Sequence, residues 1–396
     1  MELAGLTIPE KQVERISKRI GQERVLERDR DVQAYLDLPL MEKVSSPIEQ
    51  PVDLAVVEMD GGRLQIFDRR AAMAPASEGE ARAEGTGLQV DEADEEEPRQ
   101  GYWREDKIGV LMTMTSEVSA TDPCPEIPEH FVDPTRILKL ARAIKSGTSV
   151  PEQDEPAAAD GTAESGPEVE ASWTPRPQMR TAVGTRAPAK TFKAILAQAA
   201  WALGFATAKR KAFVADGAAV NWTTHKQWFS DFVAILDFIH ALSYIFAAAM
   251  AGRSFRDGWG AYVDWIQRVW SGQVEQVIAA LESRQAVLGK PAKDEPETSP
   301  RQIIAATMGY LQTHKDRMRY DAYRCAGLPL TSCHVESMIK LFNRRMKGTE
   351  KFWSEDGAEA ILQLRADYLS ENAPMRNFWE RRQTEATGRR NFRRAS

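Results

Sequence analysis

The hydrophobic and polar positions of this 396-residue chain fall into strand-like runs and helix-like spacings. Within residues 9–36, Val13, Ile16 and Ile20 recur at near-helical spacing, which predicts a helix. Five runs of apolar and β-branched residues predict short strands, at 52–59, 63–67, 107–115, 211–215 and 231–237. The sequence Asp60-Gly61-Gly62 is a turn signal, so we expect it to separate the first two of these strands. A turn is also expected between the last two strands, after Asp216-Gly217.

Helical periodicity predicts most of the remaining elements. Helices are expected over 136–145, 191–204, 240–251, 259–271, 273–288, 302–315, 334–347 and 355–370. This order of strands and helices indicates an α/β protein with a mixed sheet and helices on its faces. It matches a ribonuclease-H-like fold with an all-helical insertion before the last core helix, which is an analogy of fold and not of function.

Two stretches differ from the rest in composition, and we expect both to be disordered acidic inserts. Residues 71–100 are rich in Ala, Glu and Gly, and residues 146–190 are rich in Pro, Ala and Glu. Residues 78–97 hold nine acids and one base, and residues 152–170 hold seven acids and no base. The rest of the chain has 51 basic and 42 acidic residues, so the net charge of −6 conceals a basic body. A basic body suits a polyanionic partner.

These patterns divide the chain into seven segments. They are an N-terminal helical segment (1–50), a first core part (51–145), an acidic linker (146–190), a second core part (191–239), a helical insertion (240–325), the last core helix with a C-terminal helix (326–372), and a basic tail (373–396).

Targeting and membrane signals are weak in this sequence. The N-terminus has no basic region followed by an apolar core, so no signal peptide is predicted. The apolar stretch from Phe232 to Ala251 is interrupted by Asp237 and His240, which favours a buried strand followed by a buried helix over a membrane span. Three cysteines without a CxxC pair exclude a disulfide framework and a zinc ribbon within the chain. We therefore expect a cytoplasmic protein.

Three acids stand where they could act together. Asp60 ends the first predicted strand, Asp216 ends the fourth, and Glu336 lies in the first turn of a late helix. Carboxylates at strand ends project into the crevice where open sheets bind ligands. Three of them could hold two Mg²⁺ or Mn²⁺ ions about 3.5–4 Å apart, which suits attack on a phosphodiester. Each acid alone is a weak signal, because Asp-Gly is a common turn and a helical Glu is usually solvated.

Several strings resemble the ISKra-type insertion-sequence transposases, a DDE family of bacterial mobile elements. They include VVEMDGGRLQ (56–65), YWREDKIGVLMTM (102–114), DPCPEIPEHFVD (122–133), FVADGAAVNW (213–222), ILDFIHALSYIF (235–246) and RMRYDAYRCAGLPLTSCHVESMIKLFNRRMKG (317–348). FWSEDGAEAILQLRADYLS (352–370) continues the match, and the run from Tyr320 to Leu364 is its most specific part.

The resemblance implies that Asp60, Asp216 and Glu336 are the catalytic, metal-binding acids of a DDE-type transposase. It also implies a role for the Asp237-x-x-His240 pair, with His240 near the scissile phosphate; a satisfied histidine at a helix start is an equal alternative. Asp237 competes with Asp216 as the second acid, and we prefer Asp216 because its strand is expected beside the first strand.

The activity implied is cleavage and strand transfer at the ends of a mobile element. The implied partners are the element's terminal inverted repeats and target DNA, bound by a homo-oligomer associated with the nucleoid and not with a membrane. Basic residues that follow Glu336 are candidate DNA contacts, although a solvated basic face is the alternative: Lys340, Arg344, Arg345, Lys347 and Lys351.

Two departures from the family keep other functions open. Its members usually carry an upstream CxxC zinc-binding region and a helix-turn-helix, of which residues 1–50 resemble only the tail. The family's small residues before the glutamate are replaced by Ser332, Cys333 and His334. The alternatives are a truncated or catalytically inactive remnant that only binds DNA, and a stand-alone metal nuclease.

Overall fold

A computed structural model describes residues 2–3, 6–49, 51–66, 103–144, 173–348 and 353–394. Its centre is a mixed five-stranded sheet in the order β5-β4-β3-β6-β7. The strands are β3 (Leu54–Gln65), β4 (Trp103–Thr115), β5 (Arg176–Thr185), β6 (Arg210–Ala215) and β7 (Val233–Leu236). β3, β4 and β5 are antiparallel neighbours, whereas β6 and β7 run parallel to β3. The mixed α/β class is therefore as predicted, and this strand order is compatible with a ribonuclease-H-like arrangement.

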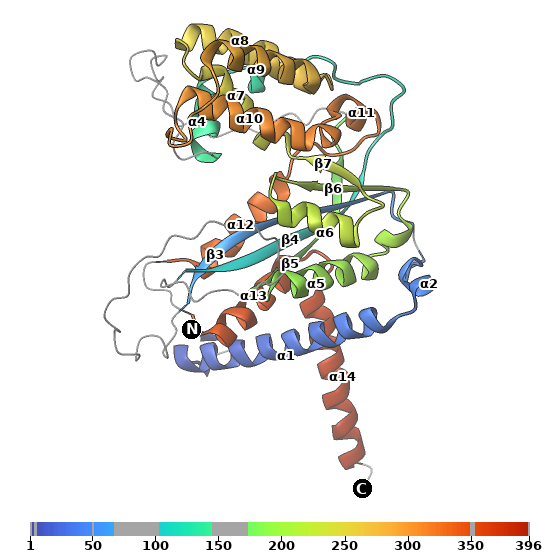
Figure 1. Cartoon of the computed structure of the whole chain (residues 1–396). Helices are drawn as coiled ribbons and strands as arrows, with labels where there is room; N and C mark the ends of the chain where they lie inside the picture. The colour runs from blue at the N-terminus through green and yellow to red at the C-terminus, as the bar shows by residue number, and fades with distance from the viewer. Residues whose placement is uncertain are drawn as a thin grey trace, which may run out of the picture.

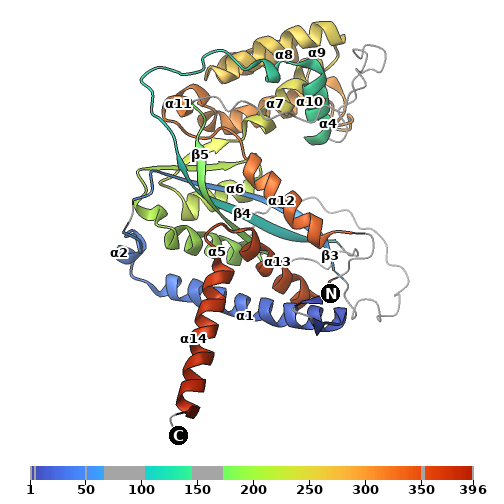
Figure 2. The same ribbon diagram turned by 180° about the vertical axis from the view of Figure 1, so that it is seen from behind.

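Helices cover both faces of the sheet (Figures 1 and 2). In chain order they are α1 (Glu10–Asp37), α2 (Leu40–Lys43), α4 (Pro134–Ile144), α5 (Ala189–Ala202), α6 (Ala219–Trp228), α7 (Phe238–Met250), α8 (Phe255–Trp270), α9 (Val274–Leu288), α10 (Pro300–His314), α11 (Tyr320–Cys325), α12 (Cys333–Met346), α13 (Glu355–Leu369) and α14 (Pro374–Arg394). Two glycines show which helix lies on which face: Gly109 of β4 faces Leu196 of α5, and Gly184 of β5 faces Phe342 of α12. A two-residue ladder, β1 (Glu2–Leu3) with β2 (Leu6–Thr7), precedes α1.

The predicted break after Asp60 is wrong, because β3 is one continuous strand through Gly61 and Gly62. Both glycines pair with β4, opposite Lys107 and Asp106. A Cβ atom at Gly62 would lie 2.7 Å from the Asp106 Oδ1 atom. The second glycine therefore leaves room for a buried carboxyl group on the neighbouring strand and is not a turn residue.

The predicted disorder over 146–190 is wrong for residues 176–185, which form β5. Composition hid this strand, although its second half, from Thr181 to Thr185, is buried. Pro177 is tolerated because β5 is an edge strand, where one missing backbone donor breaks no ladder. The predicted insert 71–100 and residues 146–172 of the predicted linker lie outside the described residues.

A second correction concerns the connection between β6 and β7, which was expected to be a turn. The two strands are parallel, and parallel neighbours need a crossover segment longer than a turn. Helix α6 supplies it. Its buried residues include the polar Asn221 and Thr224 beside Trp222, which masks the helical periodicity.

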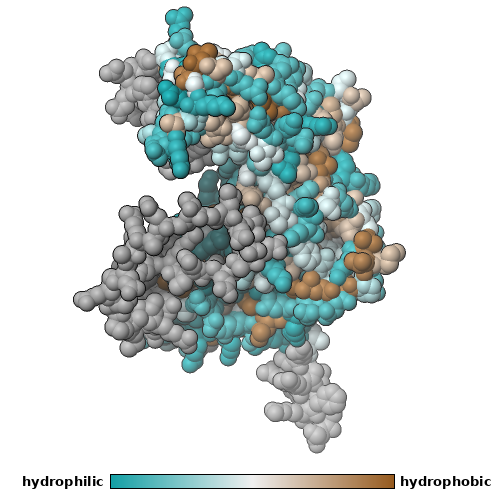
Figure 3. Space-filling model, in the orientation of Figure 1, coloured by the Kyte–Doolittle hydropathy of each residue, from teal (hydrophilic) through white to brown (hydrophobic). Residues whose placement is uncertain are grey.

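The helical insertion is present as predicted, with α7, α8, α9 and α10 grouped at one end of the sheet (Figure 1). Trp265 and Trp270 are buried in it, and Trp259 is partly buried against it. The apolar stretch after Phe232 forms β7 and the buried helix α7. Within the described chain, none of the helices combines the length and apolar character that crossing a membrane requires. On the face in Figure 3, hydrophobic residues gather only in small patches.

Both edges of the sheet are covered by hydrogen bonds from later segments. Tyr320 Oη donates to the Leu236 carbonyl at 2.9 Å, and Tyr323 Oη donates to the Ala234 carbonyl at 3.2 Å, so α11 covers β7. On β5, the Ala182 N–H donates to Ser370 Oγ at 2.9 Å. Covered edges do not pair with other chains. The tyrosines of the RMRYDAYR string therefore have a structural role.

Helix α1 is fixed to α13 by ion pairs and by one close approach. Arg24 pairs with Asp367, and Arg28 pairs with Glu359. At the crossing, Gly21 is buried, and a Cβ atom there would lie 2.3 Å from the Ala360 carbonyl oxygen. Helix α14 extends past α1, away from the rest of the protein (Figures 1 and 2). Within the predicted basic tail, Arg381 and Arg382 form ion pairs with acids of α1.

We expect Gly21→Ala to lower the free energy of unfolding by about 1–3 kcal/mol, the usual effect of overpacking. Alanine favours a helix by about 1 kcal/mol over glycine, but here the new methyl group meets a backbone oxygen that cannot rotate away. Urea denaturation followed by circular dichroism measures the change. Gly260→Ala in α8 is the control, because nothing lies within 4 Å of that position and the substitution should stabilise. Equal effects of the two substitutions would contradict the close approach.

Candidate active site

Asp60 lies within β3, two residues beyond its last pair with β6, and Asp216 directly follows the end of β6. The register pairs Glu58 of β3 with Val214 of β6, so the next two residues along each strand bring these aspartates side by side. Asp60 Oδ1 accepts a hydrogen bond from the Gly61 N–H at 2.6 Å. Asp216 Oδ1 accepts from the Ala218 N–H at 2.9 Å and from Asn221 Nδ2 at 2.7 Å, at the start of α6. The second oxygen of each aspartate makes no hydrogen bond to the described residues.

Glu336 reaches the same region from α12, which packs on β3 and β4. The helix is held there by Glu58, a fully buried residue of β3, whose Oε2 accepts from the Val335 N–H at 2.8 Å. Burial raises the pKa of Glu58 well above its ordinary value. Glu58 therefore ties the first turn of α12, and with it Glu336, to the strand that carries Asp60.

Asp237 is the most constrained acid of the region. It has no exposed surface and caps α7, with Oδ1 accepting from the His240 N–H at 3.0 Å. Its Oδ2 accepts from the Ser332 N–H at 2.6 Å and also from the Ser332 hydroxyl. Burial alone would raise the pKa of Asp237, but the interactions with His240 and Ser332 lower it below its usual value. Both oxygens are therefore engaged in fixing the backbone, on α7 and just before α12.

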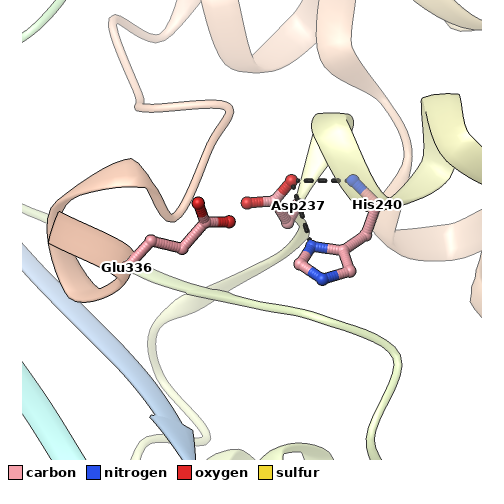
Figure 4. Close-up of side chains that lie close together, drawn as sticks. All are labelled: Asp237, His240 and Glu336. Carbon is pink, nitrogen blue, oxygen red and sulfur yellow. Dashed lines mark hydrogen bonds and ion pairs between the residues drawn. The ribbon is translucent and has the colours of Figure 1, made fainter. Parts of the chain in front are cut away.

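His240 lies beside Asp237 as a cation. Its Nδ1 lies 3.5 Å from Asp237 Oδ1. Burial alone would lower the pKa of His240, but the interaction with Asp237 and the charges of Asp216 and Glu336 raise it to about 9. The imidazole is thus protonated at neutral pH. Figure 4 shows the Glu336 carboxylate pointing toward Asp237, with His240 on the other side of Asp237.

The charges of neighbouring acids also raise the pKa values of Asp60 and Glu336. Burial raises the pKa of Asp60 to about 6; the Gly61 hydrogen bond opposes this shift, and the charges of Asp216 and Glu336 add to it. Burial also raises the pKa of Glu336, with the charge of Asp237 contributing. Concentrated negative charge that destabilises its own ionised form is a suitable environment for a cation.

The structure brings the sequence-predicted residues into one region but does not gather the predicted trio most tightly. Among the described residues, the one group whose ligand atoms lie within 4.8 Å of one another is Asp237, His240 and Glu336, which could hold a metal ion. Asp60 and Asp216 belong to no such group.

Sequence reasoning missed three residues that shape this region. Glu58 was read as part of a strand, Asn221 was expected in a turn, and Ser332 was read only as a departure from the family. A signal existed for Glu58, since a charged residue inside an otherwise apolar run, VVEM, demands a partner once buried. No sequence signal links Ser332 to Asp237, because that contact joins residues 95 positions apart.

Four of the five candidate DNA contacts lie on α12 or at its end. Lys340 and Arg344 follow Glu336 at intervals of four residues, which places all three along one side of the helix. Lys340, Arg344 and Arg345 are exposed, and Lys347 is partly exposed. The charge of Lys340 lowers the pKa of Glu336, so this lysine is close to the acid. Lys351 lies outside the described residues.

Comparisons with known families and proteins identify no relative. No protein-family model matches the chain, and no curated protein matches it.

We expect Glu58→Ala to lower the free energy of unfolding by about 1–3 kcal/mol, because the buried Val335 N–H loses its acceptor. Glu58→Gln keeps an acceptor oxygen without the buried acid and should be close to wild type. Thermal unfolding of the two variants measures the difference. Equal destabilisation by both would show that the carboxyl group itself is required, and no effect of Glu58→Ala would remove Glu58 as the anchor of α12.

Proposed function

We propose that this chain is a divalent-metal-dependent enzyme that cleaves and transfers DNA strands, of the DDE transposase type, with a ribonuclease-H-like core. The observation that carries the proposal is that three acids with uncommitted oxygens come from one region: the middle of β3, the end of the parallel strand β6 and the first turn of α12. Asp60 and Asp216 each keep one oxygen free of hydrogen bonds to the described residues, and Glu336 keeps both. The quoted strings that resemble ISKra-type transposases support the same function.

The donor set fits Mg²⁺ or Mn²⁺, which prefer carboxylate oxygens. We assign Asp60, Asp216 and Glu336 as the residues that would hold one or two such ions. Asp237 fits less well, because its oxygens are already occupied by His240 and Ser332. Bound divalent ions would polarise the scissile phosphodiester and stabilise its developing negative charge.

The chain's own groups would position the DNA around this site. His240, protonated because Asp237 faces its Nδ1, offers a second ring N–H to a phosphate oxygen. Lys340 and Arg344 continue from Glu336 along α12 and would bind the neighbouring phosphates. The proposed partner is double-stranded DNA, both the ends of a mobile element and its target, bound by a homo-oligomer.

A nicking assay tests this function. The substrate is a supercoiled plasmid that carries the gene with its natural flanking DNA, incubated with the purified chain and Mg²⁺ or Mn²⁺. We expect nicked and joined products that disappear when EDTA removes the metal. DNA binding without any product in either metal would contradict the enzymatic function and favour the non-catalytic DNA-binding alternative.

A further inference from the structure

Beside Asp216, a second group of side chains surrounds Arg317. This arginine ends the 3-10 turn Lys315–Arg317, which follows α10. Its guanidinium carbon lies 4.3 Å from the ring centroid of Trp222 on α6. Its Nη1 lies 3.0 Å from Nδ1 of His314, the last residue of α10. An arginine stacked on an indole and bonded to an imidazole is held in one orientation.

Both partners of Arg317 are uncharged at neutral pH. Burial lowers the pKa of His314, and the charge of Arg317 lowers it further, to about 4. The neutral ring therefore accepts the hydrogen bond from Arg317 through Nδ1. No carboxylate among the described residues forms an ion pair with Arg317, whereas the nearby Arg324 pairs with Asp122. The guanidinium of Arg317 is therefore held in place without a direct ion pair, although the charge of Asp316 on the same turn acts on it.

Arg317 lies in the same region of the fold as Asp216. The charge of Asp216 acts on His314. Tyr310, whose ring centroid is 4.8 Å from that of His314, packs on the residue after Asp216: a Cβ atom at Gly217 would lie 2.3 Å from the tyrosine ring. Trp222 Nε1 and the Tyr310 hydroxyl are buried and find no hydrogen-bond partner in the described part of the chain. Two buried donors without partners, in the same group of side chains as a cation that has no direct ion pair, suit an anion.

We propose that Arg317 is a phosphate-binding residue that holds the DNA backbone on the Asp216 side of the active site. This inference rests on the proposed function, because it takes its ligand from it. A cation at this position offsets the repulsion between the acids and an approaching phosphate. The planar guanidinium, already oriented by Trp222, can contact two phosphate oxygens at once. The competing role is packing alone, with Arg317 serving only to cover Trp222.

The salt dependence of DNA binding separates these two roles. Binding of a fluorescent 30-base-pair duplex is measured by anisotropy in Ca²⁺ for the full chain and for Arg317→Gln, Arg317→Lys and Arg319→Gln. Arg319 is exposed two residues away, so its variant removes the same charge without touching Trp222. A lost phosphate contact reduces the slope of log K against log salt by about 0.9. We expect this reduction, with about tenfold weaker binding, for Arg317→Gln, and a slope within error of wild type for Arg319→Gln.

A wild-type slope for Arg317→Gln would overturn the proposal while leaving the proposed function intact. Absence of salt-dependent binding by the wild-type chain would instead remove the proposed function, and this inference with it. If Arg317→Gln does not fold, Arg317→Lys decides the question. Lysine keeps the charge and loses the planar stack, so binding should weaken with an unchanged slope. Unchanged affinity of this variant would contradict a bound guanidinium.

Discussion

Replacing Asp216 with asparagine is expected to reduce metal-dependent DNA nicking by about 10³-fold, roughly 4 kcal/mol of transition-state stabilisation. The substitution removes the negative charge from the oxygen that no described residue engages. Asparagine retains an acceptor for the Ala218 N–H at the start of α6, where this residue type is well tolerated. The variant should therefore fold normally, and DNA binding should persist or strengthen because one acid no longer repels the phosphates.

Three measurements on Asp216→Asn check this result together: nicking in Mg²⁺ and Mn²⁺, duplex binding in Ca²⁺, and thermal unfolding. A matched control is Asp231→Asn, just before β7 and at the opposite end of that strand from Asp237, where the exposed acid pairs with Lys211. Its nicking rate should equal that of wild type. Nicking by Asp216→Asn at the wild-type rate would reject Asp216 as a metal ligand.

The sequence alone predicted most of the elements around this site, because they bury apolar faces with regular spacing. The strands that became β3, β4, β6 and β7 and the helices of the insertion were found from local periodicity. The position of Glu336 in the first turn of a helix could also be predicted from the residues around it. These predictions needed no knowledge of which segments meet in space.

What sequence could not predict depends on contacts between distant residues. β5 was assigned to a disordered linker, since an edge strand with a proline has a weak local pattern and is ordered by β4 and by Ser370. Gly61 and Gly62 were read as a turn, although the buried Asp106 on β4 explains the second of them. The contact that bears on the choice between Asp216 and Asp237 was equally inaccessible, because the Ser332 N–H that donates to Asp237 is 95 positions away.

Asp237→Ala is expected to lower the free energy of unfolding by about 3–5 kcal/mol, the usual result of removing one partner from a buried charged pair. The loss has three sources: the cap of α7, the charge that His240 faces, and the acceptor for the Ser332 N–H and hydroxyl. Chemical denaturation followed by tryptophan fluorescence measures it.

The contrast with a simple cap makes the Asp237 prediction specific. Ser254 caps α8 by accepting from the Asp257 N–H at 3.2 Å on the surface, and Ser254→Ala should cost only about 1 kcal/mol. Asp237→Asn should be destabilised about as much as Asp237→Ala. An amide group has a single acceptor oxygen, whereas the Asp237 carboxylate uses one oxygen for each of two sets of donors. A fully stable Asp237→Ala protein that no longer nicks DNA would reverse the assignment, making Asp237 the second metal ligand and Asp216 the cap. A destabilised one would leave Asp237 as the residue that holds His240 and α12 in place around the acids.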